Sequence, residues 1–325
     1  MTKKQLDIEI GCEVICIEIA ERNQRLFDVI RKSLKGYLAT SKKTGRLVKV
    51  VPYFHNHLFY WPPSELAKFR DFFRSVQQRF PPADRLEETV DLSLNILQHY
   101  DPDNALIRHL CDHLEKHRNL IYLMVGFDVY LYDVSSNTAF FFLKGQARPS
   151  HMLMGVMNGI MLVLSHRLIH GNGLLLHGSA IQKNDQTVLF LGLSGAGKST
   201  ITRLCDPDIC FADDGVVVKH EKNRFYTYRS PFSQTKEKNK NPDITIGKIK
   251  KIFLLEKSDR CNVLPIAKNE LMRITLMHLI HFYKYLNQET ARLGFYEVKK
   301  LLETLPSYRL QFAKSGKIWH NLVQI

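Results

Sequence analysis

The 325-residue sequence has no hydrophobic run long enough to form a membrane-spanning helix. Its longest apolar stretch, residues 152–164, is interrupted by Asn158, whereas a spanning helix needs about 20 apolar residues. The first ten residues also lack the apolar core of a signal peptide. We therefore expect a soluble, cytoplasmic protein without a membrane span, in which residues 151–170 form a buried helix.

Cysteine is scarce and shows no metal-binding pattern. The six cysteines stand at positions 12, 16, 111, 205, 210 and 261, and none forms a Cys-x-x-Cys pair. Secreted and zinc-binding chains usually space their cysteines more regularly. We expect reduced and mostly buried thiols.

Acidic residues are outnumbered, with 32 Asp and Glu against 46 Lys and Arg, for a formal net charge of +14. Such a charge favours encounters with anionic molecules. Residues 219–251 hold much of the excess, in Lys219, Lys222, Arg224, Arg229, Lys236, Lys238, Lys240, Lys248, Lys250 and Lys251. Because no nucleic-acid-reading module accompanies them, nucleic acid is not an expected partner. Two interpretations remain: a solvated face, or a lid or docking loop for an acidic partner.

The residue patterns divide the chain into two predicted domains, 1–149 and 150–325, with a linker at 145–149. The first domain is expected to be α+β and to serve an accessory or recognition role. Its predicted strands are 6–19, 47–53, 121–133 and 138–143, the last two paired through the turn at 135–137, and its predicted helices are 64–79 and 103–118.

The second predicted domain alternates strands with helices, which is typical of an α/β domain with a layered sheet. After the helix at 151–170, the sequence predicts strands at 174–181, 187–191, 209–211, 249–255 and 308–312, and an apolar helix at 271–286. A further helix should follow the glycine-rich segment that begins at Gly192.

Residues 192–199, Gly-Leu-Ser-Gly-Ala-Gly-Lys-Ser, match the phosphate-binding pattern G-x-x-x-x-G-K-[ST] in full. Glycines allow main-chain N–H groups to surround phosphate oxygens, and the following helix adds its positive end. Lys198 would reach the β- and γ-phosphates, and Ser199 would bind Mg²⁺. The predicted nucleotide-binding residues are Gly192, Ser194, Gly195, Ala196, Gly197, Lys198, Ser199 and Thr200.

Two adjacent acids, Asp213 and Asp214, follow the strand predicted at 209–211. One carboxylate can hold Mg²⁺ or its waters, and the other can accept a proton from an attacking hydroxyl. His177 stands in the strand predicted before the loop strand. Antiparallel pairing of 174–181 with 187–191 would place it beside the phosphates, where an imidazole can stabilise transferred charge.

The order His177-Gly, then Gly-x-Ser-Gly-x-Gly-Lys-Ser, then Ala-Asp-Asp resembles the catalytic domain of HPr kinase/phosphorylase, whose fold is akin to phosphoenolpyruvate carboxykinase. The late segment Leu305-Pro-Ser-Tyr-Arg-Leu-Gln-Phe312 is similar to one in HPr-kinase-related proteins. The resemblance covers roughly residues 150–325. It implies an HPr kinase/PEP carboxykinase-like P-loop catalytic domain of α/β class, preceded by a smaller α+β domain.

Carried over to these positions, the resemblance implies an ATP- and Mg²⁺-dependent serine kinase. Lys198 and the loop amides would hold the ATP phosphates, and Ser199 and Asp214 would serve Mg²⁺. Asp213 would be the general base and His177 would contact the phosphates, although the roles of the two aspartates could be exchanged. Related proteins include kinases of precursor peptides, so the expected partner is a protein or peptide, which could be acidic, and an oligomer is compatible with the family.

Two other functions fit the same residues. The first is a kinase for a small hydroxylated molecule, or a simple nucleoside triphosphatase, because a fold does not fix a function. The second is a non-catalytic nucleotide sensor or adaptor, against which the complete set of Lys198, Ser199, Asp213 and Asp214 argues.

Overall fold

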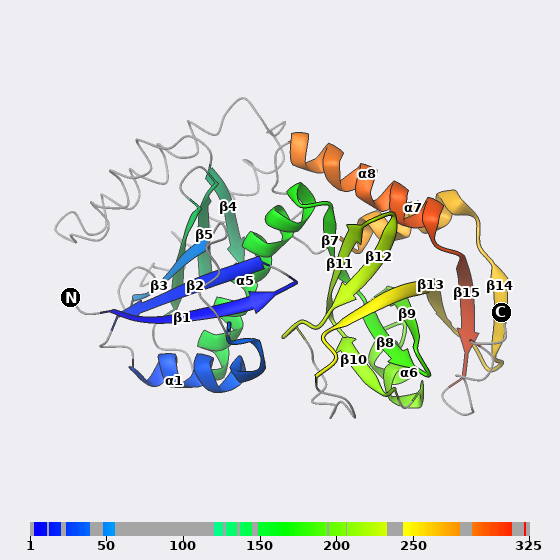
Figure 1. Cartoon of the computed structure of the whole chain (residues 1–325), viewed down its shortest axis with the longest axis horizontal. Helices are drawn as coiled ribbons and strands as arrows, with labels where there is room; N and C mark the ends of the chain where they lie inside the picture. The colour runs from blue at the N-terminus through cyan, green and yellow to red at the C-terminus, as the bar shows by residue number, and fades with distance from the viewer. Residues whose placement is uncertain are drawn as a thin grey trace, which may run out of the picture. The chain divides into compact units, whose positions relative to one another are not determined.

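The computed structural model is a mixed α/β protein that consists mostly of β-sheet (Figure 1). It describes residues 3–11, 13–20, 24–39, 48–55, 120–125, 128–134, 137–144, 149–193, 195–205, 207–232, 243–279, 288–313 and 322. The chain forms two compact units, one of residues 1–8, 14–163 and 285–288, and the other of residues 9–13, 164–284 and 289–325.

The first unit contains a six-stranded sheet in the order β1-β2-β3-β6-β5-β4. Its strands are β1 (Lys3–Ile10), β2 (Glu13–Ala20), β3 (Val48–His55), β4 (Leu120–Val125), β5 (Asp128–Asp133) and β6 (Thr138–Lys144). Helix α1 (Gln24–Ser33) and a 3-10 turn (Lys35–Tyr37) follow β2. β3 is parallel to β2 and β6, whereas β5 is antiparallel to β4 and β6.

Two single strands predicted in this unit are pairs of strands. Residues 6–19 contain β1 and β2, which separate at Gly11, and residues 121–133 contain the antiparallel strands β4 and β5. The predicted pairing of β5 with β6 is confirmed. The helices predicted at 64–79 and 103–118 lie outside the described residues, as does most of the predicted linker.

Helix α5 (Pro149–His170) confirms the buried helix predicted at 151–170. Val156, Ile160 and Leu164 are fully buried, so the helix packs as a core element. By length and composition alone, residues 150–170 could also cross a membrane, but 61% of the most apolar stretch is buried within the protein.

The second unit is built on a nine-stranded sheet, in which β10-β8-β9-β13-β12-β11-β7 are neighbours in that order and β15 joins β13 to β14. The strands are β7 (Gly173–His177), β8 (Ser179–Lys183), β9 (Gln186–Leu191), β10 (Ile209–Ala212), β11 (Gly215–Glu221), β12 (Arg224–Tyr228), β13 (Ile246–Lys257), β14 (Asn262–Pro265) and β15 (Ser307–Phe312). The helices are α6 (Lys198–Cys205), α7 (Lys268–Met277) and α8 (Gln288–Thr304).

The predicted strand 174–181 is wrong as a single element, because the chain bends at Gly178. β7 pairs with β11, whereas β8 pairs with β9 and β10. A Cβ atom on Gly178 would lie 2.9 Å from the Phe190 carbonyl oxygen, so the bend brings the chain too close to β9 for a side chain. His177 therefore belongs to a different strand pair from the one predicted.

Two other expectations need correction, and one helix was missed. The helix predicted at 271–286 ends at Met277, and His278 and Leu279 are outside it. Helix α8 was not predicted. The basic segment 219–251 is not a loop throughout, because its described ends belong to β11, β12 and β13, which contribute buried apolar residues to the sheet. Lys236, Lys238 and Lys240 lie outside the described residues.

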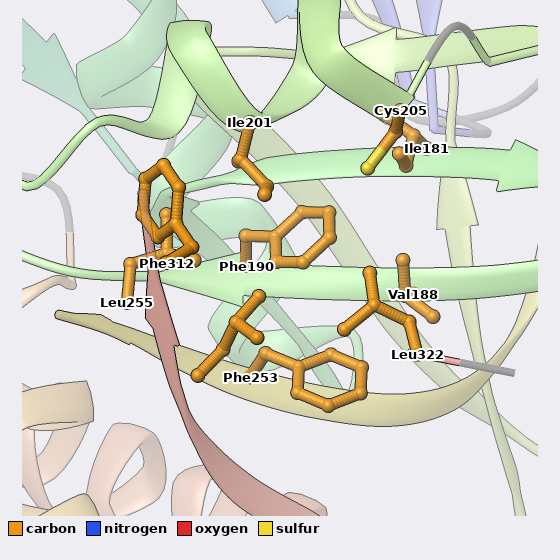
Figure 2. Close-up of a cluster of buried hydrophobic side chains, with 10 residues drawn as sticks. Ile181, Val188, Phe190, Ile201, Cys205, Phe253, Leu255, Phe312 and Leu322 are labelled. Atoms are coloured by element: carbon orange, nitrogen blue, oxygen red, sulfur yellow. The ribbon is translucent and has the colours of Figure 1, made fainter. Parts of the chain in front are cut away.

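A hydrophobic cluster fixes α6 to the sheet (Figure 2). Ile201 and Cys205 of α6 are fully buried against side chains of β8, β9, β13 and β15. The rings of Phe190 and Phe253 lie 5.8 Å apart between centroids, beneath the helix. Truncation of a buried Phe typically costs about 3–5 kcal/mol, so this cluster strongly constrains the position at which α6 begins.

Candidate functional site

Four strands of the second unit end at one edge of the sheet, where the predicted site residues lie. β9 and β10 are both antiparallel to β8, so they run in the same direction. β13 is parallel to β9 and to β15. The carboxyl ends of β10, β9, β13 and β15 therefore face the same edge, which is where open α/β sheets bind ligands.

The pairing register brings the two acids to the level of the glycine-rich loop. Ala180 of β8 lies opposite both Ala212 of β10 and Leu189 of β9. Asp213 and Asp214 follow Ala212 directly, just as residues 190–191 complete β9 before the loop. The sequence prediction that these segments form one site is consistent with this arrangement.

The glycine-rich loop connects β9 to α6, as predicted, and two of its glycines have positive φ angles. Gly195 has φ +77° and Gly197 has φ +103°, and α6 begins at Lys198. Ser194 lies outside the described residues. The loop thus has the strand–loop–helix setting that the phosphate-binding pattern requires.

Lys198 is buried and lies against its own loop. Its Nζ donates to the carbonyl oxygens of Gly192 at 2.8 Å and Leu193 at 3.3 Å. Burial lowers the pKa of Lys198, and the negative charge of Asp214 opposes this shift by raising it. Asp214 therefore acts electrostatically on the ammonium group at the helix start.

Side-chain hydrogen bonds hold the first turn of α6 against the sheet. The Thr202 hydroxyl donates to the Lys198 carbonyl oxygen at 3.0 Å and lies 2.6 Å from the Ser179 hydroxyl of β8. Ser199 and Thr200 are half-buried on the same turn. These contacts orient the helix whose N–H groups would face a phosphate.

The two adjacent acids differ in exposure. Asp213 is 2% exposed, whereas the Asp214 side chain is 32% exposed. Asp214 Oδ1 lies 2.8 Å from His177 Nδ1, and the Asp214 carbonyl oxygen accepts a hydrogen bond from Gly178 N–H at 3.0 Å. The accessible carboxylate of the pair is thus held by a histidine.

His177 reaches this edge by a different route from the one expected. It lies opposite Gly215 in the β7–β11 pair, next to Asp214 in the chain. Its ring stacks on that of His278, with centroids 6.2 Å apart. The pairing of β7 with β11 therefore brings His177 to the acids, and His278 lies between His177 and the loop.

Sequence reasoning missed His278, which follows α7 and is 4% exposed. Its Nε2 lies 2.6 Å from the Gly192 carbonyl oxygen, and its Nδ1 lies 2.7 Å from that of Ile274. Carbonyl oxygens only accept hydrogen bonds, so both contacts form at once only when each ring nitrogen carries a proton. The His278 carbonyl oxygen also accepts from His177 N–H at 2.7 Å.

The position of α7 is fixed by an arginine on β15. Arg309 donates through one nitrogen to both carboxylate oxygens of Glu270, at 2.6 and 2.7 Å, and through another to Glu256 at 3.0 Å. Hydrogen bonds between two charged groups are roughly twice as strong as those between neutral ones. Arg309 thereby orients the helix that His278 directly follows.

We expect His278→Ala to weaken binding of MgATP by up to about tenfold, because a hydrogen bond to a main-chain carbonyl oxygen contributes roughly 0.5–1.5 kcal/mol. His278→Gln, whose amide can still donate to Gly192, should retain part of the affinity. Calorimetric titration of the folded variants measures the effect. His220→Ala serves as the control, since His220 stacks on Phe225 at a centroid distance of 4.6 Å. Equal affinities for His278→Ala and His220→Ala would contradict a role for His278 in holding the loop.

The donor set at this edge fits a magnesium-bound triphosphate. Mg²⁺ prefers oxygen ligands and is commonly held by one or two carboxylates together with substrate phosphates. The Asp214 carboxylate and the Ser199 hydroxyl offer oxygen donors of this kind, and the Lys198 ammonium group is a cation that could complement phosphate charge. In the described part of the chain, no group of three or more His, Cys, Asp or Glu side chains could hold a metal ion by itself.

Comparison with protein families matches residues 143–325 to a family described as SynChlorMet cassette protein ScmC. The chain belongs to this family. The comparison with curated proteins returned no match.

The expectation that the chain is an HPr-kinase-related protein is therefore wrong, because the family that matches is ScmC. The motifs behind that expectation are short, and a phosphate-binding loop followed by two acids can occur in different families. For this ScmC family member, the function must be argued from the residues at the site.

Proposed function

We propose that this ScmC family member is an ATP- and Mg²⁺-dependent kinase that transfers the γ-phosphoryl group to a serine hydroxyl of a protein or peptide. Its catalytic domain would be a P-loop domain of α/β class. The observation that supports the proposal is the convergence of Lys198, Asp213, Asp214 and His177 at one sheet edge. Phosphoryl transfer depends mainly on positioning and charge neutralisation, and these residue types supply both.

Each residue has a defined task in this proposal. Lys198 and the loop N–H groups bind the phosphates, and Ser199 and Asp214 hold Mg²⁺. When bound, Mg²⁺ neutralises phosphate charge. Asp213 accepts the proton of the acceptor hydroxyl, unless the more exposed Asp214 takes this role and Asp213 serves the metal.

His177 would contribute through one ring nitrogen. Its Nδ1 is already engaged by Asp214 at 2.8 Å, so Nε2 is the atom that can contact a phosphate oxygen. A hydrogen bond from an imidazole N–H to a phosphate oxygen stabilises the negative charge of that oxygen.

The cations of the sheet support an acidic acceptor. Lys248 of β13 is half-buried, and the nearby charges of Arg224 and Lys250 lower its pKa. Tyr226 lies opposite Lys248 in the β12–β13 pair. An anionic segment bound across these strands would relieve the mutual repulsion of the three cations.

Incubation of the protein with γ-labelled ATP, Mg²⁺ and an extract of the source cells tests the proposal. We expect label on the serine of a polypeptide. Label on a metabolite would indicate a small-molecule kinase, free phosphate alone would indicate a triphosphatase, and no turnover with intact nucleotide binding would indicate a sensor.

The same assay tests the proposed roles of Asp213 and Asp214. Asp213→Asn should lower phosphoryl transfer by roughly 10²–10⁴-fold, the usual contribution of a general base. Asp214→Asn should instead raise the Mg²⁺ concentration needed for half-maximal transfer. If the two aspartates exchange roles, the two phenotypes will also exchange. Full transfer by both variants, with the fold confirmed by circular dichroism, would rule out the proposed site.

A further inference from the structure

A cleft of about 600 Å³ opens beside the glycine-rich loop. It is lined by residues that follow three neighbouring strands: Gly197 and Thr200 after β9, Lys257, Ser258 and Asp259 at the end of β13, and Phe312 and Ala313 at the end of β15. Small-molecule sites typically measure about 300–1,000 Å³ and lie at the carboxyl ends of parallel strands. The cleft meets both conditions.

The strand register shows that β13 and β15, which form the walls of the cleft, extend beyond the end of β9, which forms its floor. Leu191, the last residue of β9, lies opposite Leu254 of β13, and Lys257 lies opposite Phe312 of β15. β13 therefore continues three residues beyond the level at which β9 ends, or about 10 Å at the usual rise of a strand. β15 continues with it.

The lining combines an apolar surface with polar groups. A Cβ atom on Gly197 would lie 2.6 Å from Phe312 Cζ, so the phenyl ring packs directly against the loop. Ser258 N–H donates to the Phe312 carbonyl oxygen at 3.1 Å, which joins the two walls. The Ser258 hydroxyl accepts from Arg260 N–H at 3.2 Å and can donate its own proton to a ligand. Asp259 is exposed beside it.

The order of the strands places the acids and the cleft on opposite sides of β9. The acids follow β10, two strands from β9 on one side, whereas the cleft is formed with β13 and β15 on the other side. A nucleotide bound by the loop at the end of β9 can therefore direct its terminal phosphate towards the acids and its nucleoside towards the cleft.

We propose that this cleft binds the purine nucleoside of the triphosphate whose phosphates the loop holds, an inference that rests on the proposed function. The purine lies against Ala313 and the small part of the buried Phe312 ring that lines the cleft. The Asp259 carboxylate, which only accepts hydrogen bonds, pairs with amino hydrogens of the base. Ser258 and Lys257 face the ribose and the phosphate next to it.

The test compares two magnesium-bound probes by calorimetry: ATP, which has a nucleoside, and inorganic tripolyphosphate, which has none. The wild-type chain should bind ATP at least about tenfold more tightly. Asp259→Ala, which removes a charged hydrogen-bond acceptor, and Ala313→Phe, which fills the cleft, should each weaken ATP binding about tenfold and leave tripolyphosphate binding unchanged. Asp185→Ala is the control, since Asp185 is an exposed carboxylate in the turn between β8 and β9.

The outcomes separate this inference from the proposed function. Equal wild-type affinities for the two probes, or equal loss of both in the cleft variants, would refute the nucleoside site and leave the phosphate loop intact. Failure of a folded wild-type chain to bind either probe would refute the proposed function and the cleft with it. A nucleoside-dependent gain with GTP but not with ATP would support the cleft and refute ATP as the donor.

Discussion

Lys198→Met is expected to lower phosphoryl transfer by at least about 10²–10³-fold, because it removes a preorganised cation from the place where phosphate charge develops. Methionine keeps much of the length of the side chain. The Gly192 carbonyl oxygen, which Lys198 contacts, also accepts from His278, so the loop retains a partner. Initial rates with labelled ATP measure the loss, and thermal denaturation confirms the fold.

Lys183→Met provides a matched control for this result. Lys183 is also a partly buried lysine that donates to a main-chain carbonyl oxygen, that of Cys205, at 2.7 Å. It contacts the carboxyl end of α6, whereas Lys198 begins the helix. The control should keep wild-type turnover. Equal rates for the two variants would show that no phosphate is transferred at the loop.

The parts of the site that were predictable from sequence are those set by local chain geometry. The strand at 187–191, the glycine-rich turn and the following helix form one continuous segment, so the spacing of their residues predicts their arrangement. β9, α6 and β10 agree with those predictions to within a residue or two. The acids were also placed correctly, since they directly follow β10.

The parts that were missed depend on pairings between distant residues. At the bend, Gly178 lies too close to Phe190 of the neighbouring strand for a side chain, and no local pattern records this approach. His278 contacts Gly192 across 86 positions of sequence, and its location depends on the salt bridges of Arg309 with α7 and β13. Hydrogen bonds between residues so far apart in sequence leave no local pattern from which they could be predicted.

Recognition of the family failed for a related reason. The residues that supported it are few, and apart from the late segment 305–312 they are the types that a phosphate-binding loop and its acids require. Such residues are dictated by the chemistry of phosphate and magnesium, so they indicate a kind of site more reliably than a family. The match of residues 143–325 to ScmC draws on a much longer part of the chain.

Gly197→Ala is expected to destabilise the second unit by about 2–5 kcal/mol. A φ of +103° is strongly unfavourable for a residue with a side chain, which adds roughly 1–2 kcal/mol. The new Cβ would lie 2.6 Å from Phe312 Cζ, and overpacking of this kind costs about 1–3 kcal/mol more. Urea denaturation of the variant measures the total change in the free energy of unfolding.

Gly195→Ala isolates the contribution of the contact with Phe312. Gly195 also has a positive φ, +77°, but no atom lies within 4 Å of the position of its Cβ. Gly195→Ala should therefore lower the free energy of unfolding only by the backbone contribution of about 1–2 kcal/mol. Equal losses for the two alanine variants would mean that Phe312 does not pack against the loop.

The double variant Gly197→Ala/Phe312→Leu gives the most direct measure of this packing. Leucine keeps an apolar side chain in the cluster of Figure 2 but lacks the ring atom that the new methyl group would meet. If the ring restricts residue 197, the double variant should be more stable than the sum of the single changes predicts, by about 1–2 kcal/mol. Additive changes would instead locate the whole cost in the backbone and leave the loop independent of the hydrophobic core.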